Sequence, residues 1–118
     1  MKPADWRKLD DGAASVIRAI AAELPDPLPV LEDLESAESR NQSSWILEIR
    51  VSGGGPKLSY PDGPLPVEAL IPDEANYQGE IIVWVTGGHL SGLEYAWVTD
   101  ETPVEWPKPD RMQVRSRR

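Results

Sequence analysis

The sequence has 118 residues, of which 40% are apolar and 27% charged, and it contains no cysteine. A chain of this length fits one domain and can bury roughly two thirds of the surface that its unfolded form exposes. The lack of cysteine excludes disulfides, thiolate zinc sites and a cysteine nucleophile. We therefore expect a single folded domain, residues 1–118, built around one apolar core.

The N-terminal apolar stretch is interrupted by Arg18 and follows helical spacing, whereas a secretory signal has an uninterrupted apolar core. No run reaches the roughly 18 apolar residues that a membrane span requires. We expect a cytoplasmic protein that does not act at a membrane.

Charge is distributed unevenly along the chain, whose net charge is −8. Residues 108–118 hold five bases and one acid, a net charge of +4, and residues 1–107 hold seven bases and nineteen acids, a net charge of −12. An acidic body argues against a nucleic-acid partner and suits a basic protein partner. Excess carboxylate also serves solubility alone, and a basic terminal segment such as 108–118 commonly frays.

Two helices are predicted in the first third of the chain. Between Asp10 and Leu24 apolar residues recur at steps of three and four, with Asp10 or Asp11 placed to cap the helix and Pro25 to stop it. A proline-rich connector follows. Leu28, Leu31 and Leu34 have the spacing of a second, short helix.

Strands are predicted in the remaining two thirds. Residues 44–51 alternate, with Trp45, Leu47, Ile49 and Val51 on one side and Glu48 and Arg50 on the other. Glycine and proline clusters at 53–56 and 60–64 predict loops. Residues 65–71 alternate again, and the prolines at 66 and 72 favour a short or edge strand.

The segments 80–86 and 89–97 are predicted to form a hairpin. Gly87-Gly88 supplies the positive φ angles of a two-residue turn, which places Val85 opposite Leu90. Regular pairing would then put Leu90 and Leu93 on opposite faces of the sheet. We expect a β-bulge at Ser91-Gly92, because one extra residue returns the later side chains to the apolar face. Helix first and strands afterwards predict an α+β fold, with the N-terminal helix packed on an antiparallel sheet of about four strands.

The sequence carries no recognisable catalytic or metal-binding motif, and we predict no catalytic residue, cofactor or metal. His89 is the only histidine, and its place after the diglycine turn favours an exposed hairpin residue. Gly53-Gly54-Gly55-Pro56-Lys57 lacks the spacing of a phosphate loop. The acid pairs at 73–74 and 100–101 lack the pattern of a calcium loop.

Five tryptophans in a chain without phenylalanine are the most unusual compositional feature. Trp45, Trp84 and Trp97 fall within predicted strands and are expected in the core. Trp6 and Trp106 fall outside them and are expected as surface anchors.

The segment 97–107 combines aromatic and acidic side chains directly after the best-predicted strand. It is interpreted either as a recognition surface for a basic partner or as a proline-bounded wrap over the sheet edge. The predicted partner-binding residues are Trp97, Asp100, Glu101, Glu105 and Trp106.

The stretch GGHLSGLEYAWVTDETPVEWPKPDRMQV, with DGPLPVEAL and GEIIVWV before it, resembles a pattern of small uncharacterised bacterial proteins. The resemblance covers roughly residues 62–114 and implies no catalytic residues. In size and charge the chain is also similar to immunity proteins of bacterial toxin systems.

These features predict a non-enzymatic, acidic protein-binding module, immunity-like in character, that neutralises a basic toxin or nuclease domain. The alternative is a small enzyme or ligand-binding domain that uses carboxylates on the concave sheet face, namely Glu68, Glu80 and Glu94. A third interpretation is self-association through an exposed edge strand.

Overall fold

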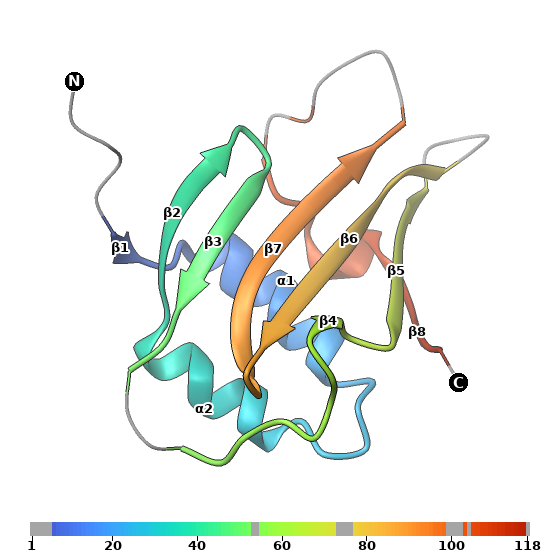
Figure 1. Ribbon diagram of the computed structural model, residues 1–118. Helices are drawn as coiled ribbons and strands as arrows, with labels where there is room; N and C mark the ends of the chain where they lie inside the picture. Colours follow the sequence, from blue (N-terminus) through green and yellow to red (C-terminus); the bar gives the residue numbers. More distant parts are fainter. Residues whose placement is uncertain (1–5, 53–54, 73–76, 99–102, 104, 118) are drawn as a thin grey trace, which may run out of the picture.

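The computed structural model describes residues 6–52, 55–72, 77–98, 103 and 105–117 (Figure 1). In this part of the chain two α-helices pack on one face of an eight-stranded antiparallel sheet. The strand order is β1-β2-β3-β7-β6-β5-β8, and β4 also pairs with β6. The predicted α+β class with an antiparallel sheet is therefore confirmed, whereas the expected number of about four strands is wrong.

Helix α1 (Asp11–Ala21) forms where the sequence predicts it. The Asp10 carboxylate accepts hydrogen bonds from the backbone N–H groups of Gly12 at 3.0 Å and Ala13 at 3.3 Å, which satisfies two amides that the first helical turn leaves free. Its apolar stripe is almost fully buried and consists of Ala13, Ala14, Val16, Ile17, Ile20 and Ala21.

Helix α2 (Leu28–Ser36) is also present, but its buried face differs from the predicted leucine stripe. Leu28 is exposed, and the helix instead buries Pro29, Val30 and Asp33. Asp33 can be buried because α2 packs at the end of the sheet beside the β6–β7 turn, where its carboxylate has hydrogen-bond donors.

The strands range from two to ten residues in length. They are β1 (Arg7–Lys8), β2 (Glu38–Ser43), β3 (Ile46–Arg50), β4 (Gly63–Pro64), β5 (Val67–Pro72), β6 (Tyr77–Thr86), β7 (His89–Trp97) and β8 (Gln113–Ser116). A 3₁₀ turn, η1 (Pro109–Arg111), precedes β8.

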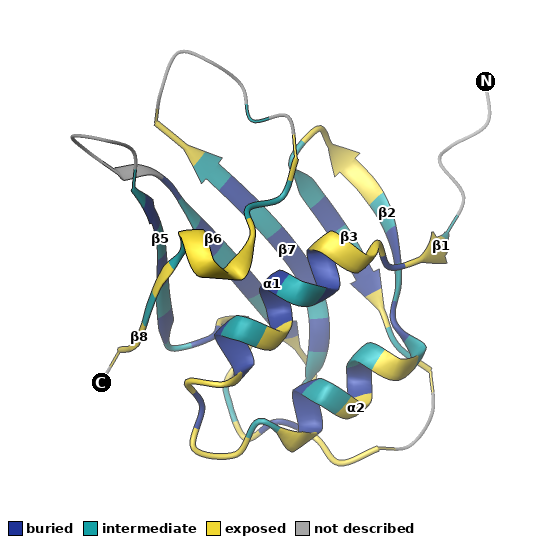
Figure 2. Cartoon of the chain, turned by 180° about the vertical axis from the view of Figure 1, so that it is seen from behind, coloured by how far each residue is buried: buried dark blue, intermediate teal, exposed yellow. Residues whose placement is uncertain are grey.

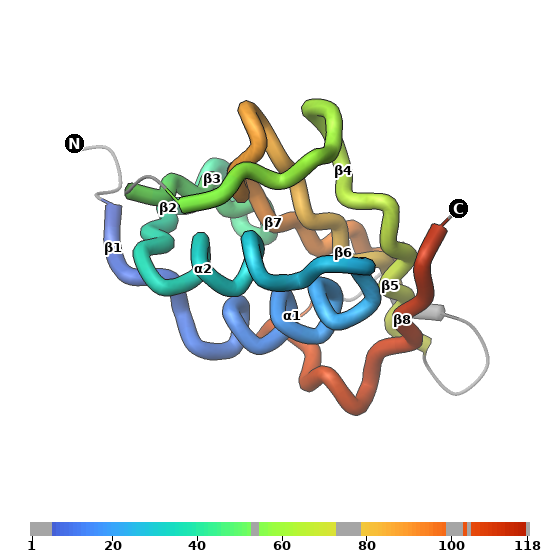
Figure 3. Tube along the Cα trace, turned by 90° about the horizontal axis from the view of Figure 1, so that it is seen from below, coloured from blue at the N-terminus to red at the C-terminus, as the bar shows by residue number. Residues whose placement is uncertain are grey.

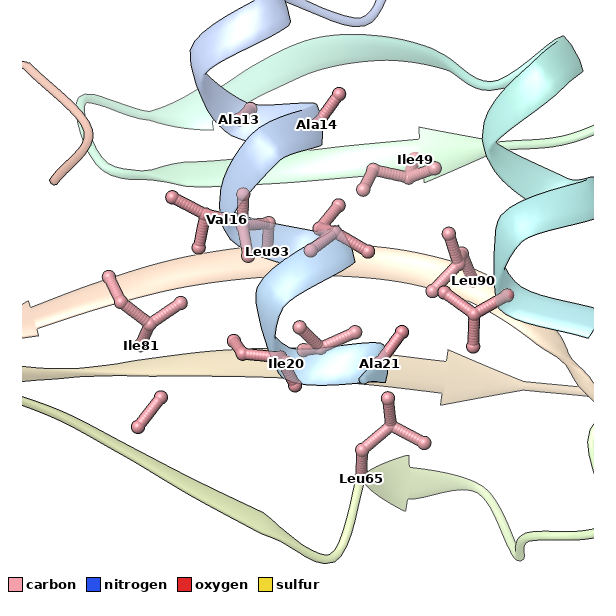
Figure 4. Packing of buried hydrophobic residues seen from close by; sticks show 14 of the residues in the cluster. Ala13, Ala14, Val16, Ile20, Ala21, Ile49, Leu65, Ile81, Leu90 and Leu93 are labelled. Atoms are coloured by element: carbon pink, nitrogen blue, oxygen red, sulfur yellow. The ribbon is translucent and has the colours of Figure 1, made fainter. Parts of the chain in front are cut away.

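The core lies between the sheet and α1. Figures 2 and 3 show both helices on the same side of the sheet, with α1 running across its central strands. In Figure 4, Val16 and Ile20 of α1 point toward Ile81 of β6 and Leu93 of β7. Full burial of one such aliphatic side chain contributes about 1.5–3 kcal/mol to the free energy of folding. Among the described residues, no helix lies on the opposite face of the sheet.

The β6–β7 hairpin has the predicted turn and the predicted bulge. Gly87 and Gly88 have φ angles of 61° and 82°. Val85 pairs with Leu90 and Trp84 with Gly92, so Ser91 is the extra residue. The bulge makes Val83 the partner of Leu93, in place of the Gly92 that regular pairing would give, and both Leu90 and Leu93 are buried.

A network of hydrogen bonds fixes the tip of this hairpin. Asp33 of α2 is 5% exposed and accepts from the backbone N–H of Leu90 at 3.0 Å, and its other oxygen lies 3.1 Å from Nδ1 of His89. Asp62 accepts from the Gly87 N–H at 2.9 Å, and the Gly88 carbonyl accepts from the Leu58 N–H at 2.8 Å. His89 is therefore half-buried beside a buried carboxylate, and its expected exposure is wrong.

Strand β5 buries the predicted face, but its position in the sheet differs from expectation. Its inward residues Val67, Ala69 and Ile71 are buried as predicted, but β5 is not an edge strand because β8 pairs with it along Val67–Leu70. Pro66 and Pro72 lie outside these four paired positions and so do not prevent the pairing. The segment 108–118, expected to fray, contributes η1 and β8 to the fold, and Arg118 lies outside the described residues.

The diglycine turn gives a matched pair of substitutions. Gly87→Ala should cost about 1–2 kcal/mol of unfolding free energy, because an L residue with a positive φ is strained while a new Cβ meets nothing within 4 Å. Gly88→Ala should cost about 1 kcal/mol or more beyond that, because its Cβ would lie 2.8 Å from Cβ of Lys57. Urea unfolding measures both variants, and equal costs would show that Lys57 does not press on the turn.

Candidate functional site

Four glutamates form a diagonal row across the face of the sheet that carries no helix. Glu48 of β3 is diagonal to Glu94 of β7, because Glu48 pairs with Gly92 and Ile46 with Glu94. Glu94 is diagonal to Glu80 of β6, since Ile82 pairs with Glu94 and Glu80 with Ala96. Diagonal neighbours lie about 7–8 Å apart, within reach of long side chains. We call these residues the glutamate row, which Glu68 of β5 completes, diagonal to Glu80 through the Leu70–Glu80 pair.

Arginines occupy both ends of the glutamate row. At one end Nη2 of Arg40 lies 3.1 Å from Oε2 of Glu48. At the other end Nε of Arg115 lies 2.6 Å from Oε1 of Glu68, and Nη2 of Arg117 lies 2.7 Å from Oε2 of Glu80. These pairs are half-exposed and contribute little to stability, but they neutralise charge at the two ends of the row.

Glu94, near the middle of the row, has a different partner. Its Oε1 accepts a hydrogen bond at 3.3 Å from Nε1 of Trp84, and among the ion pairs of the described residues none includes Glu94. A Cβ at Gly92 would lie 3.4 Å from Trp84, so the indole packs beside that glycine. The surplus negative charge of the row therefore lies at Glu94, beside an aromatic ring.

Glu94 also lines a hollow of about 380 Å³ that runs along the end of β7. At this end β3 begins at Ile46, directly after the turn from β2, whereas β7 continues to Trp97, paired with β6 through Gly79. Trp97 is 37% exposed. We call this hollow the edge groove, and its lining residues are Ser43, Ser44, Trp45, Ile46, Glu94, Tyr95, Ala96 and Trp97.

The structure separates the three strand tryptophans that were expected in the core. Trp45 is half-buried and packs against the core. Trp84 is half-buried on the helix-free face, and Trp97 is exposed at the edge groove, so the core prediction is wrong for these two. Trp97 was also predicted to bind a partner, and its exposure leaves its indole accessible.

Trp106 belongs to an aromatic cluster on the helix side of the sheet. Its ring centroid lies 5.1 Å from Trp45 and 6.2 Å from Tyr95, and Trp45 meets Tyr95 edge-on at 5.7 Å. Trp106 is half-buried against the core, an arrangement that matches the wrap interpretation of this segment. Glu105 beside it is exposed. The predicted residues Asp100 and Glu101 lie outside the described residues.

Trp6, expected as a surface anchor, contacts two arginines of the chain itself. The guanidinium carbons of Arg40 and Arg50 lie 4.6 Å and 4.5 Å from its ring centroid, within cation–π range. Trp6 is half-buried beneath these side chains, near the Arg40 end of the glutamate row.

The carboxylates proposed for a small enzyme share a face of the sheet, and two of them line different hollows. Glu68, Glu80 and Glu94 all belong to the glutamate row, yet Glu94 lines the edge groove and Glu68 lines a separate, smaller hollow beside β8. Within the described residues no group of three or more acids or histidines is placed to hold a metal ion. The arrangement provides an acidic surface on which Glu94 carries the charge that no ion pair of the described residues neutralises.

Sequence reasoning missed Asp33 and the arginines of the last strand. Asp33 lies three residues after the fully buried Val30, and this helical spacing is the signal that could have placed it on the buried face. Arg115 and Arg117 occupy alternate positions after Val114, and this spacing is a weak signal for a strand within a basic segment.

No helix within the described ranges is long and apolar enough to cross a membrane. Comparisons of the chain with protein-family models, curated proteins and solved structures gave no match.

The aromatic cluster predicts an alkaline stability profile. Burial raises the pKa of the Tyr95 hydroxyl above its ordinary value of 10.0, because the phenolate would lose its hydration. The unfolded chain ionises first, so the stability that Tyr95 contributes is fully present below about pH 10 and is lost as pH rises from there through the folded-state pKa. Tyr95→Phe should flatten this decline in urea-unfolding midpoints measured from pH 8 to 11. An unchanged slope would contradict the assignment to Tyr95.

Proposed function

We propose that this chain is a non-enzymatic module that binds a basic protein, in the manner of an immunity protein that covers a toxin or nuclease domain. The observation that carries the proposal is the position of Glu94, which bears the surplus charge of the glutamate row and lines the same groove as the exposed Trp97.

Charge supports a basic partner. Residues 1–107 have a net charge of −12. A surface with such an excess accelerates the approach of a basic protein, and the acceleration falls as salt screens it. Nucleic acid would be repelled by the same carboxylates.

The edge groove supports a specific contact in addition to steering. Binding energy in protein interfaces concentrates in a few aromatic and charged residues surrounded by contacts that exclude water. Glu94 would pair with a lysine or arginine of the partner on the helix-free face. Trp97, three residues further along β7 and therefore on its other face, would pack against an apolar side chain of the partner at the sheet edge. Asp100, Glu101 and Glu105 follow Trp97 in sequence, and we propose that their charges attract the basic partner to this surface.

The test begins with recovery of a basic protein that co-purifies with the chain at low salt and leaves it as salt rises. With that partner, the association rate should fall about tenfold or more between 50 and 500 mM salt. Glu94→Gln should weaken binding about tenfold, since it removes a charge from the contact centre.

Glu35→Gln is the matched control, because it removes the same charge from an exposed position of α2 on the other side of the sheet and should leave affinity close to that of the parent. Elution of the chain from native lysate as a monomer without a partner would count against the proposal. Equal effects of the two substitutions would reject Glu94 as its centre.

A further inference from the structure

The basic end of the chain is seated as a strand on the acidic sheet. Residues of β8 pair with β5 in an antiparallel register, Val67 with Ser116, Glu68 with Arg115, Ala69 with Val114 and Leu70 with Gln113. The segment 108–118 has a net charge of +4 against −12 for the residues before it. The pairing of β8 with β5 therefore shows how this sheet binds a basic, extended segment.

The basic segment is bound through backbone pairing and through the charged contacts of two arginines. Arg115 of β8 and Arg117, which directly follows the strand, are two positions apart, and together they reach the last two members of the glutamate row. Arg115 contacts Glu68, and Nη2 of Arg117 lies 2.7 Å from Glu80 and 3.6 Å from Glu68. The backbone N–H of Arg117 also donates to the Pro66 carbonyl at 2.8 Å. Val114, the residue after Gln113, faces the helix side of the sheet and packs against the core.

Strand β8 makes fewer buried contacts than the central strands. The side chains of Arg115 and Arg117 are 77% and 51% exposed, whereas that of Glu68 is 19% exposed. Gln113 and Ser116 are exposed as well, so Val114 is the one side chain of this strand that packs against the core. Exposed ion pairs contribute little, and terminal strands with few buried contacts open before the rest of a sheet.

We propose that the β5 edge is a docking site for a basic, extended segment of a partner protein, which adds to the sheet as a strand in the place of β8. Backbone hydrogen bonds to Val67–Leu70 supply affinity, as in other complexes that extend a sheet, and Glu68 and Glu80 supply selectivity for charge. The register predicts the sequence of the partner segment. It has an apolar residue at the position of Val114, a basic residue at that of Arg115, any residue next, and a basic residue at that of Arg117. This site is distinct from the edge groove and does not depend on it.

A peptide with the sequence of residues 108–118 serves as the probe, and the full-length chain with Arg115→Glu and Arg117→Glu serves as the receptor. The two reversals repel β8 from Glu68 and Glu80 and free the edge. Fluorescence anisotropy should show the peptide binding this variant at least about tenfold more tightly than the parent chain, whose edge is occupied. Hydrogen exchange of the Val67–Leu70 amides should slow when the peptide is added to the variant.

A peptide in which the residues corresponding to Arg115 and Arg117 are replaced by glutamate should not bind, and added salt should weaken binding of the parent peptide. Equal binding of the parent peptide to both chains would overturn the proposal. Adding Glu35→Gln, on the other side of the sheet, to the receptor should leave peptide affinity unchanged. Peptide binding is measured without the edge-groove partner, so a failure of this site is separable from a failure of the edge groove.

A second variant covers the case in which the double reversal unfolds the chain. Glu68→Gln with Glu80→Gln should raise amide exchange at Gln113–Ser116 about tenfold while the β6–β7 amides keep their protection. Unchanged exchange at Gln113–Ser116 would show that charge does not hold β8 and would overturn the proposal. A dimer of the parent chain on sizing, with its exchange pattern intact, would identify a second copy as the occupant and would likewise contradict a separate partner.

Discussion

The bulge at Ser91 divides the sheet into an apolar face and a charged face. Because Ser91 is the extra residue of the bulge, Leu90 and Leu93 both turn toward the helix side of the sheet, although they are three residues apart. Every later residue of β7 is shifted to the opposite face from the one that regular pairing would give it. Tyr95 consequently joins the aromatic cluster on the helix side, and Glu94 faces away from the helices.

The same shift creates the candidate site. Without it, Glu94 would point into the apolar layer under α1, and the diagonal row that now runs from Glu48 to Glu68 would be broken at its centre. With it, the central strands each place one glutamate on the helix-free face, and the arginines of β2 and β8 meet the row at its ends. The scaffold and the proposed binding surface therefore depend on one register.

Local signals were sufficient to predict the elements around the bulge. The apolar spacing of α1, its Asp10 cap, the diglycine turn and the alternation of β3 and β5 are each encoded within a few neighbouring residues. The bulge itself followed from the conflict between Gly87-Gly88 and the positions of Leu90 and Leu93. The expected strand number failed because β1, β2, β4 and β8 are short or polar. Strand β2 buries Ser39 alone among its six residues, and it forms because β3 offers an edge to pair with.

The candidate site could be predicted only in part, since it depends on pairing between distant strands. Glu68, Glu80 and Glu94 were recognised as carboxylates of different strands, but their alignment with Glu48 requires the register of four strands. Trp97 was recognised from its place at the end of an apolar run. Asp33 owes its position to a contact with Leu90, 57 residues away, and Arg115 contacts Glu68, 47 residues away.

The register of the β6–β7 hairpin is the most direct test of this account. Cross-strand nuclear Overhauser contacts report it, because α-protons of facing residues in an antiparallel pair lie close together where the two residues do not hydrogen-bond to each other. The bulged register predicts contacts between the α-protons of Leu93 and Val83 and between those of Tyr95 and Ile81. Contacts of Leu93 with Ile82 and of Tyr95 with Glu80 would show a regular ladder and contradict both the two-faced sheet and the glutamate row.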